Sequence, residues 1–217
     1  MKVKIGEYNP TKGELGISVA FLIGVLYGDE TIESSRDSNG RLALYSLSKS
    51  FEERDKHNKI VKSLSDNSEV LNKILRQYYP TYEYFLFIPF IQNVLILAIL
   101  EKLNVESIKK LTICGKPDLV VEIESRGNRY KLPFEVKLLK NIFDVKKSIN
   151  QAMVYSFIFT APAFILLFSQ YNSKLVKVIH IPYSFEVQKN VEKMVEKAIK
   201  KLNIPGAGFE PATSRFL

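Results

Sequence analysis

The chain has 217 residues, of which 46% are hydrophobic, and its 31 basic and 23 acidic side chains give a formal net charge of +8. This length suits one domain with a sizeable core, and the positive balance favours a polyanionic partner. The composition excludes a four-cysteine iron–sulfur cluster and an intrachain disulfide, because Cys114 is the only cysteine. Cys114 fits a small core residue, with a redox role as the alternative.

The sequence predicts neither a signal peptide nor a membrane span. Residues 1–10 are polar and lack the apolar core of a signal peptide. The most hydrophobic stretch, 85–100, contains Pro89, Gln92 and Asn93 and falls short of the ~20 apolar residues that a span needs. We therefore expect a cytoplasmic protein without a membrane partner.

The first half of the chain is predicted to be mainly helical. Its elements, in chain order, are an apolar helix over 13–27, a polar connection over 28–42, helical spacing over 44–76 with a polar break at 65–68, and a buried helix over 89–104. The domain organisation that follows is a helical extension over 1–80, packed on a core over 81–204, with a flexible tail over 205–217.

Strands and helices alternate in the second half. The predicted elements are strands over 111–124 and 131–140, a helix over 145–159, strands over 163–169 and 175–181, and an amphipathic helix over 185–202. The strand over 163–169 is apolar throughout, which is typical of a central strand. This order predicts an α/β sandwich.

Two of these strands form a predicted hairpin with charged side chains on one face. Side chains alternate along 118–124 and 131–138, which places Asp118 on the polar face of the first strand and Glu135 and Lys137 on that of the second. A symmetric loop centred on Arg126 and Gly127 pairs Asp118 directly with Glu135. Directly opposed residues have Cβ atoms about 5 Å apart, so both carboxylates would project from the same side of the sheet.

A divalent metal ion is the predicted occupant of this site. Two ionised carboxylates so close repel each other unless a cation holds them. Oxygen ligation without a nearby His or Cys favours Mg²⁺ or Mn²⁺, which lowers the pKa of a bound water and polarises a phosphate. Lys137 would orient the attacking water or stabilise the charge of the transition state. The alternative is a solvent-facing hairpin whose charges only increase solubility.

The pattern continues downstream with Gln151 and Tyr155, which lie four residues apart on one face of the predicted helix. In this order, the chain resembles the PD-(D/E)XK nuclease superfamily over about 111–184 in three motifs: Pro117-Asp118, Glu135-x-Lys137 and Gln151-x-x-x-Tyr155. The last motif resembles that of the RecB-like and Cas4-like branch. An ordinary helix surface is the alternative for Gln151 and Tyr155.

The resemblance implies a restriction-endonuclease-like mixed sheet flanked by helices. It also implies that Asp118 and Glu135 ligate the metal and that Lys137 serves the nucleophilic water. Gln151 and Tyr155 would approach the DNA or support the site. The superfamily often adds an acid or a histidine from upstream, and the candidates, which the sequence does not rank among themselves, are Glu14, His57 and Glu83. An ordinary surface position is the alternative for each of them.

Positive charge follows the proposed site at Lys140, Lys146 and Lys147, where a scissile phosphate would lie. A solvated helix entry is the alternative for these lysines. The features together predict a metal-dependent DNA nuclease in replication, recombination or repair. They leave open an endonuclease, an exonuclease or a Holliday junction resolvase, which would be a homodimer. The other class is a non-catalytic DNA-binding protein that keeps the nuclease fold.

The tail over 205–217 differs from the rest of the chain. Back-translated, Gly208-Phe209-Glu210-Pro211 can be written GGG-TTC-GAA-CCC, which resembles the T-arm of a tRNA gene, a common integration site for viruses and plasmids. A mobile element of an archaeon, such as a spindle-shaped virus (fusellovirus), would fit, and the protein would then act in the host-cell cytoplasm. The alternative is an ordinary Gly/Pro tail, and neither reading gives it a role in the fold.

Overall fold

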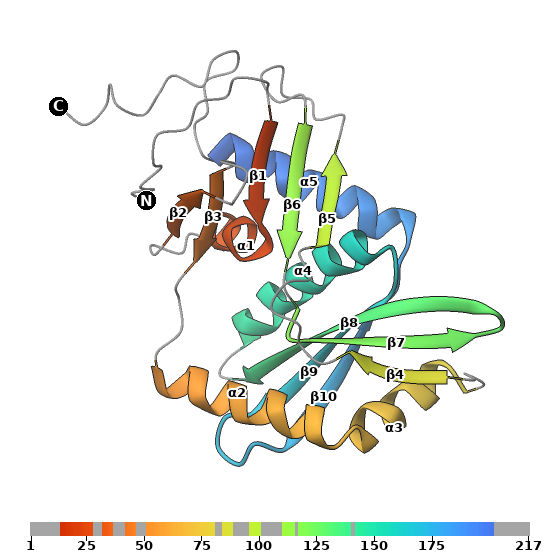
Figure 1. Cartoon of the computed structure of the whole chain (residues 1–217). Helices are drawn as coiled ribbons and strands as arrows, with labels where there is room; N and C mark the ends of the chain where they lie inside the picture. The colour runs from red at the N-terminus through yellow and green to blue at the C-terminus, as the bar shows by residue number, and fades with distance from the viewer. Residues whose placement is uncertain are drawn as a thin grey trace. The chain divides into compact units, whose positions relative to one another are not determined.

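Figure 1 shows the computed structural model, which describes residues 14–27, 32–36, 42–46, 51–80, 84–88, 96–100, 110–115, 117–139 and 142–201. The chain divides into two compact units. The first comprises 1–48, 95–115 and 188–217, and the second comprises 49–94 and 116–187. None of the described helices is long and apolar enough to cross a membrane.

The second unit is built on a five-stranded sheet of order β10-β9-β8-β7-β4. Its strands are β4 (Tyr84–Ile88), β7 (Leu119–Ser125), β8 (Asn128–Leu139), β9 (Ala163–Ser169) and β10 (Leu175–Ile181). β8 and β9 run parallel, while all other neighbours in this sheet run antiparallel. The expected α/β fold, a mixed sheet flanked by helices, is therefore confirmed.

One face of this sheet carries an apolar core. Side chains alternate along β7, so that Leu119, Val121 and Ile123 are buried on this face. Phe134 of β8 and Phe164 of β9 stack beside them, with ring centroids 4.7 Å apart. Two helices, α2 (Phe51–Asp66) and α3 (Glu69–Tyr78), complete the core with Ile60, Leu64, Leu71, Ile74 and Leu75.

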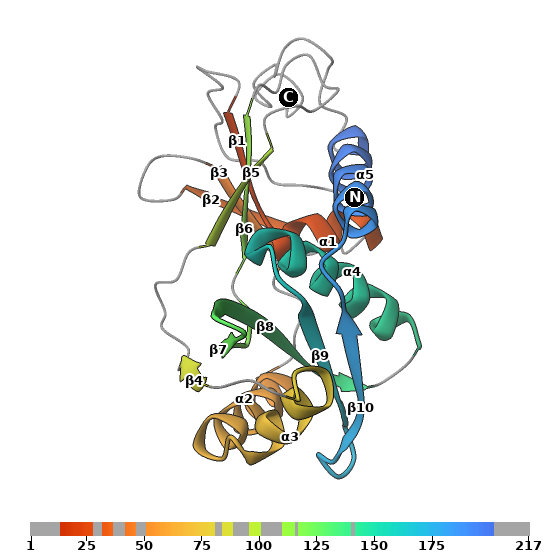
Figure 2. The same cartoon turned by 90° about the vertical axis from the view of Figure 1, so that its right-hand side faces the viewer.

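Helix α4 (Ile142–Phe159) packs against β8 and β9 and covers the opposite face (Figure 2). By alternation, Glu135 of β8 and its register partner Ile165 of β9 belong to this face. β9 thus has a helix layer on each side and a strand at each edge. This position explains why its residues from Ala163 to Phe168 are all buried, and it confirms the interior strand that the apolar sequence predicts.

The first unit contains a three-stranded sheet of order β1-β6-β5. β1 (Glu14–Ser18) runs parallel to β6 (Lys110–Gly115), and β5 (Ile96–Leu100) runs antiparallel to it. A hairpin pairs β2 (Ile32–Arg36) with β3 (Leu42–Ser46), and α1 (Val19–Tyr27) follows β1 directly.

Helix α5 (Phe185–Lys201) begins in the second unit and continues in the first. Val187, Val191 and Val195 are buried at a spacing of four residues, so the helix has the apolar stripe that the sequence predicts. The predicted strands over 163–169 and 175–181 agree with β9 and β10 at both ends.

The prediction of a buried helix over 89–104 is wrong for the described residues of this range, because Ile96–Leu100 is strand β5. The preceding apolar residues form another strand, β4. Periodicity does not distinguish a helix from a strand in apolar runs this short. Here the partners decide, since β4 pairs with β7 in one sheet and β5 pairs with β6 in the other.

Three further predictions need correction. The helix over 13–27 begins with strand β1, the polar connection over 28–42 contains β2, and β3 precedes the helices predicted over 44–76. In each case strand pairing overrides the local pattern. The single strand over 111–124 is two strands, β6 and β7, in different sheets. Pro117 separates them because a proline cannot donate a hydrogen bond to a strand ladder.

The proposed domain boundaries at 80 and 204 stay predictions. Helices α2 and α3, which fall within the expected extension over 1–80, contribute to the core of the second unit. The tail over 205–217 lies outside the described residues.

Candidate functional site

The hairpin of β7 and β8 sets the backbone positions of the two carboxylates. Its turn consists of Arg126 and Gly127, whose φ angles of 53° and 74° are both positive, as a type I′ turn requires. Residues pair across the hairpin from Ser125 with Asn128 to Leu119 with Phe134. The ladder ends at this pair, and the same register extended by one residue would place Asp118 opposite Glu135. The predicted register is therefore confirmed.

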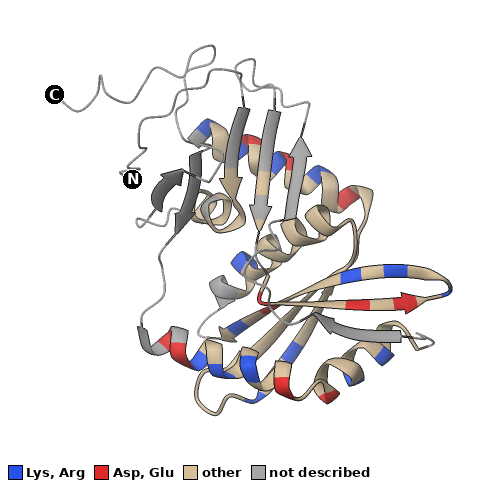
Figure 3. Cartoon of the chain, viewed as in Figure 1, with Lys and Arg blue, Asp and Glu red and all other residues tan. Residues whose placement is uncertain are grey.

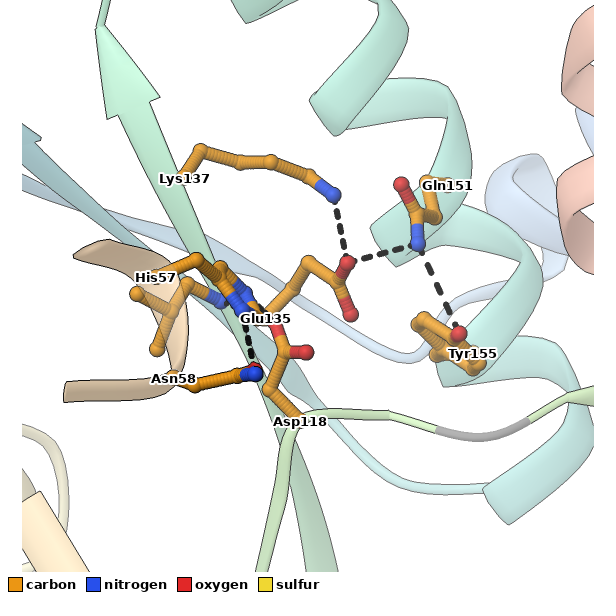
Figure 4. Close-up of polar contacts among 8 residues, drawn as sticks. His57, Asn58, Asp118, Glu135, Lys137, Gln151 and Tyr155 are labelled. Carbon is orange, nitrogen blue, oxygen red and sulfur yellow. Dashed lines mark hydrogen bonds and ion pairs between the residues drawn. The ribbon is translucent and has the colours of Figure 1, made fainter. Parts of the chain in front are cut away.

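Asp118, which Figure 4 labels, stands directly before β7 and has two contacts. Its Oδ2 accepts a hydrogen bond of 2.8 Å from the backbone N–H of Val136 and lies 3.1 Å from Nε2 of His57 on α2. Burial by itself raises the pKa of Asp118. The hydrogen bond and charge of His57, the charge of Lys137 and the Val136 amide outweigh burial and hold this pKa below its ordinary value of 3.8. Asp118 is therefore ionised at neutral pH.

Of the three upstream candidates, the structure brings His57 to the site. Its side chain is 11% exposed, and its Nδ1 lies 3.5 Å from Oδ1 of Asn58, at the limit of a hydrogen bond. Glu14 lies on β1 of the other unit, with its side chain outside the described part, and Glu83 lies outside the described residues. No local pattern ranks His57 first, because its contact depends on how α2 packs.

Glu135 is nearly fully buried, with 4% of its surface exposed. Its Oε1 accepts hydrogen bonds from Nζ of Lys137 at 2.5 Å and from Nε2 of Gln151 at 2.7 Å. Burying a carboxylate is costly unless it is paired, and these two donors supply the pairing. Lys137 comes from the same strand, whereas Gln151 comes from the helix that covers this face of the sheet.

Gln151 and Tyr155 share one face of α4, as the sequence predicts. Nε2 of Gln151 lies 3.5 Å from the hydroxyl oxygen of Tyr155, so its amide group reaches both Tyr155 and Glu135 (Figure 4). Tyr155 is only 3% exposed. Of the two roles that the resemblance implies, this burial favours supporting the site over touching DNA directly.

The β7–β8 hairpin carries both acidic and basic side chains, whereas α4 carries lysines (Figure 3). On the far half of the hairpin, basic residues of β8 pair with acids of β7; Nε of Arg129 lies 3.2 Å from Oε2 of Glu124. On α4, Lys146 is exposed and Lys147 is half-buried, while Lys140 lies outside the described residues.

The side chains that could contact a cation here are two carboxylates and one imidazole, because His57, contrary to the expectation of no nearby histidine, lies beside Asp118. Among the described residues, no group of three or more His, Cys, Asp and Glu side chains is arranged to hold a metal ion. Asp118 and Glu135 supply carboxylate oxygens, and Mg²⁺ commonly takes one or two carboxylates and completes its shell with water and substrate phosphate. Two carboxylates would leave the other positions of such an ion to water and to a substrate.

The backbone N–H of Val136 is a member of the site that the sequence analysis missed. It holds Asp118 through a hydrogen bond whose donor does not depend on the side-chain type. The only signal for it was the strand register. Val136 follows Glu135, so a register that sets Glu135 against Asp118 also brings the Val136 amide next to Asp118.

No protein-family model matches the sequence, and no curated protein matches it. Three solved structures show a loose likeness. The crystal structure of SSO0001 is 12% identical in sequence, and the match covers 89% of this chain and 79% of the SSO0001 chain with a TM-score of 0.42. Dxo1 of K. lactis in complex with manganese has 10% identity, 93% and 51% coverage and a TM-score of 0.40. Rai1 of Scheffersomyces stipitis has 10% identity, 92% and 63% coverage and a TM-score of 0.39. The chain thus spans about half the length of the Dxo1 chain and less than two thirds of the Rai1 chain.

Proposed function

We propose that this chain is a metal-dependent DNA nuclease whose centre consists of Asp118, Glu135 and Lys137. The observation that carries the proposal is the juxtaposition of an ionised aspartate and a buried glutamate on a hairpin, with a lysine bound to the glutamate. The Lys137 ammonium offsets one carboxylate charge, and a bound metal ion would offset the charge that an approaching phosphate adds. DNA as the substrate rests on the net charge of +8 and on the resemblance of the motifs.

Each residue has a distinct task in this proposal. Asp118 and Glu135 would hold Mg²⁺ or Mn²⁺, which when bound lowers the pKa of a water and polarises the scissile phosphate. Lys137 would stabilise the negative charge that develops on the phosphate. Gln151 and the Val136 amide would keep the two carboxylates oriented, as outer partners of metal ligands commonly do.

Cleavage of plasmid and oligonucleotide DNA with Mg²⁺ or Mn²⁺ tests the proposal. Asp118→Asn and Glu135→Gln each remove one ligand charge, so we expect each to lower the cleavage rate by about 10²-fold or more. Glu124→Gln is the matched control, because Glu124 lies on β7, the strand that follows Asp118, but pairs with Arg129 at the far half of the hairpin. Wild-type cleavage by either site variant would show that the proposed centre is wrong.

A panel of linear, nicked, flapped and four-way substrates, combined with the oligomeric state, separates the nuclease types. A homodimer that cuts four-way junctions would be a resolvase, because such a junction presents two equivalent scissile strands. Preference for ends would mark an exonuclease. The setting in a viral or other mobile element rests on the sequence of the tail alone.

A second candidate function is DNA binding without cleavage. It is favoured by the contacts of Glu135, whose Oε1 is already engaged by Lys137 and Gln151. The protein would then need no divalent ion for binding, and its affinity for DNA would not fall when EDTA removes the metal. Absence of cleavage on every substrate of the panel, together with this indifference to metal, would select the binding function.

A further inference from the structure

The turn between β9 and β10 carries a feature that the proposed centre does not use. At its tip, Tyr171 exposes 91% of its surface. A single exposed aromatic residue is common and means little by itself. Three further observations, on the backbone, the position and the charge of this turn, point to a ligand.

Hydrogen bonds hold the backbone of the turn. Ser169 N–H donates to the carbonyl oxygen of Lys174 at 2.9 Å, and Ser173 N–H donates to the carbonyl oxygen of Ser169 at 3.0 Å. The N–H of Tyr171 itself donates to Oγ of Ser169 at 3.2 Å, and that of Lys174 donates to Oδ1 of Asn172 at 3.1 Å. The ring of Tyr171 is therefore presented from an ordered backbone, which reduces the entropy lost when a ligand binds.

The turn lies at the same end of the sheet as Lys137. β9 runs parallel to β8, with Lys137 opposite Leu167 and Leu139 opposite Ser169. Ser169 is thus two residues, or about 7 Å, beyond the level of Lys137, and the turn follows directly. Figure 1 shows the arrowhead of β8 and the β9–β10 turn at this common end. A DNA strand that passes Lys137 would reach the turn within a few nucleotides.

Two exposed lysines follow Tyr171 in the sequence. Lys174 and Lys177 are both exposed, one in the turn and one on β10. No Asp or Glu occurs in the sequence between Asp144 and Glu186. An exposed aromatic ring beside lysines, without acids, is the combination by which proteins bind single-stranded nucleic acid, because a base stacks on the ring while the lysines attract phosphates.

We infer that Tyr171 stacks on an unpaired base of the substrate DNA, with Lys174 and Lys177 beside the neighbouring phosphates. An unpaired base is required because bases inside a duplex already stack on each other. The inference rests on the proposed function for the position of the scissile phosphate. It names the substrate class as DNA with a single-stranded segment, such as a flap or an overhang, next to the cleavage site.

Binding titrations of the full chain in Ca²⁺ test this inference with two DNAs, a blunt duplex and the same duplex with a 5′ or 3′ overhang. Tyr171→Ala should weaken binding of overhang DNA by about tenfold, within the roughly 5- to 150-fold range that stacking of one base provides. Blunt duplex should bind Tyr171→Ala as tightly as it binds the wild type. Tyr171→Phe keeps the ring and should bind overhang DNA normally, and Tyr183→Ala, an exposed tyrosine beyond the other end of β10, is the matched control.

A fluorescent adenine analogue, placed at successive positions of the overhang, provides a second readout. Stacking should quench it at one position with the wild type and not with Tyr171→Ala. If overhang DNA binds with this dependence on Tyr171 but is never cut, the nuclease proposal fails and the inference stands.

The inference is overturned if Tyr171→Ala binds overhang DNA and quenches the analogue as the wild type does, even where cleavage is intact. An equal loss of affinity for blunt and overhang DNA overturns it as well, because that result marks a contact without selectivity for unpaired bases. Failure of the wild type to bind DNA overturns both proposals. Thermal unfolding of each variant verifies that the exposed substitution leaves the fold intact.

Discussion

Asp118 and Glu135 face each other across one hairpin, yet their surroundings differ. The side chain of Asp118 is 18% exposed and touches an imidazole and a backbone amide. That of Glu135 is 5% exposed and touches an ammonium and a side-chain amide. An incoming cation would therefore compete with Lys137 and Gln151 at Glu135, and with His57 at Asp118.

Lys137 separates catalysis from binding better than either carboxylate does. If its ammonium stabilises the transition state, Lys137→Ala should lower the single-turnover cleavage rate at saturating protein by about 10²-fold or more, with little change in DNA affinity in Ca²⁺. One phosphate contact among several is only a small share of binding.

Lys131→Ala is the matched control for this measurement. Lys131 lies on the same strand and the same face, six residues before Lys137, and its side chain is 61% exposed. We expect the control to cleave at the wild-type rate. A normal bound-state rate for Lys137→Ala, with weaker binding, would remove Lys137 from the catalytic assignment.

The depressed pKa of Asp118 links stability to pH. Because the pKa is lower in the folded state than in the unfolded chain, ionised Asp118 stabilises the fold above the ordinary value of 3.8. This stabilisation is lost as the pH falls through the folded pKa. The difference in free energy of unfolding between the wild type and Asp118→Asn should therefore be fully present above pH 3.8 and shrink as the pH falls below it.

Urea unfolding at a series of pH values, with EDTA present so that no divalent ion contributes, measures this difference. A gap between wild type and variant that stays constant down to the acid limit would contradict the assigned contacts of Asp118.

At the scale of elements, β8 is the strand on which the site depends. It pairs with β7 on one side and with β9 on the other, and it is covered by α4 on the face that carries Glu135. Two neighbours hold its register, so a change in the β7–β8 turn should affect stability more than the site.

Gly127 tests this expectation. A Cβ added at Gly127 meets no atom within 4 Å, so Gly127→Ala costs only the strain of a positive φ, about 1 kcal/mol of unfolding free energy. Gly127→Asn should cost less, because asparagine tolerates this conformation better. Both variants should cleave DNA at the wild-type rate. Denaturant unfolding measures the first expectation, and a slower cleavage rate in a stably folded variant would contradict the second.

For the whole molecule, the net charge of +8 sets an expectation for salt dependence. Binding that neutralises two or more phosphates should weaken at least about tenfold between roughly 50 and 200 mM salt, because counterions are released from the DNA. Replacing one phosphate-binding lysine should reduce the slope of log affinity against log salt by about one. An affinity that stays flat over this range would count against a nucleic acid as the partner.

The local pattern of the sequence determined several features of this molecule. The bounds of β9 and β10, the helical face shared by Gln151 and Tyr155, and the opposition of Asp118 and Glu135 all follow from it. The strands and the helix face depend on a period of two or 3.6 residues, and the register depends on equal numbers of residues on both sides of a two-residue turn. Such signals need no distant partner.

Only the tertiary structure decided the other features. The apolar residues of β4 and β5 suit a helix or a strand equally by composition, and their pairing with β7 and β6 selected the strand. His57 reached Asp118, over sixty residues away in sequence, because α2 packs on the sheet, and the burial of Tyr155 depends on the sheet that α4 covers. Contacts between distant segments depend on which surfaces pack together, and local periodicity specifies the surfaces without specifying their partners.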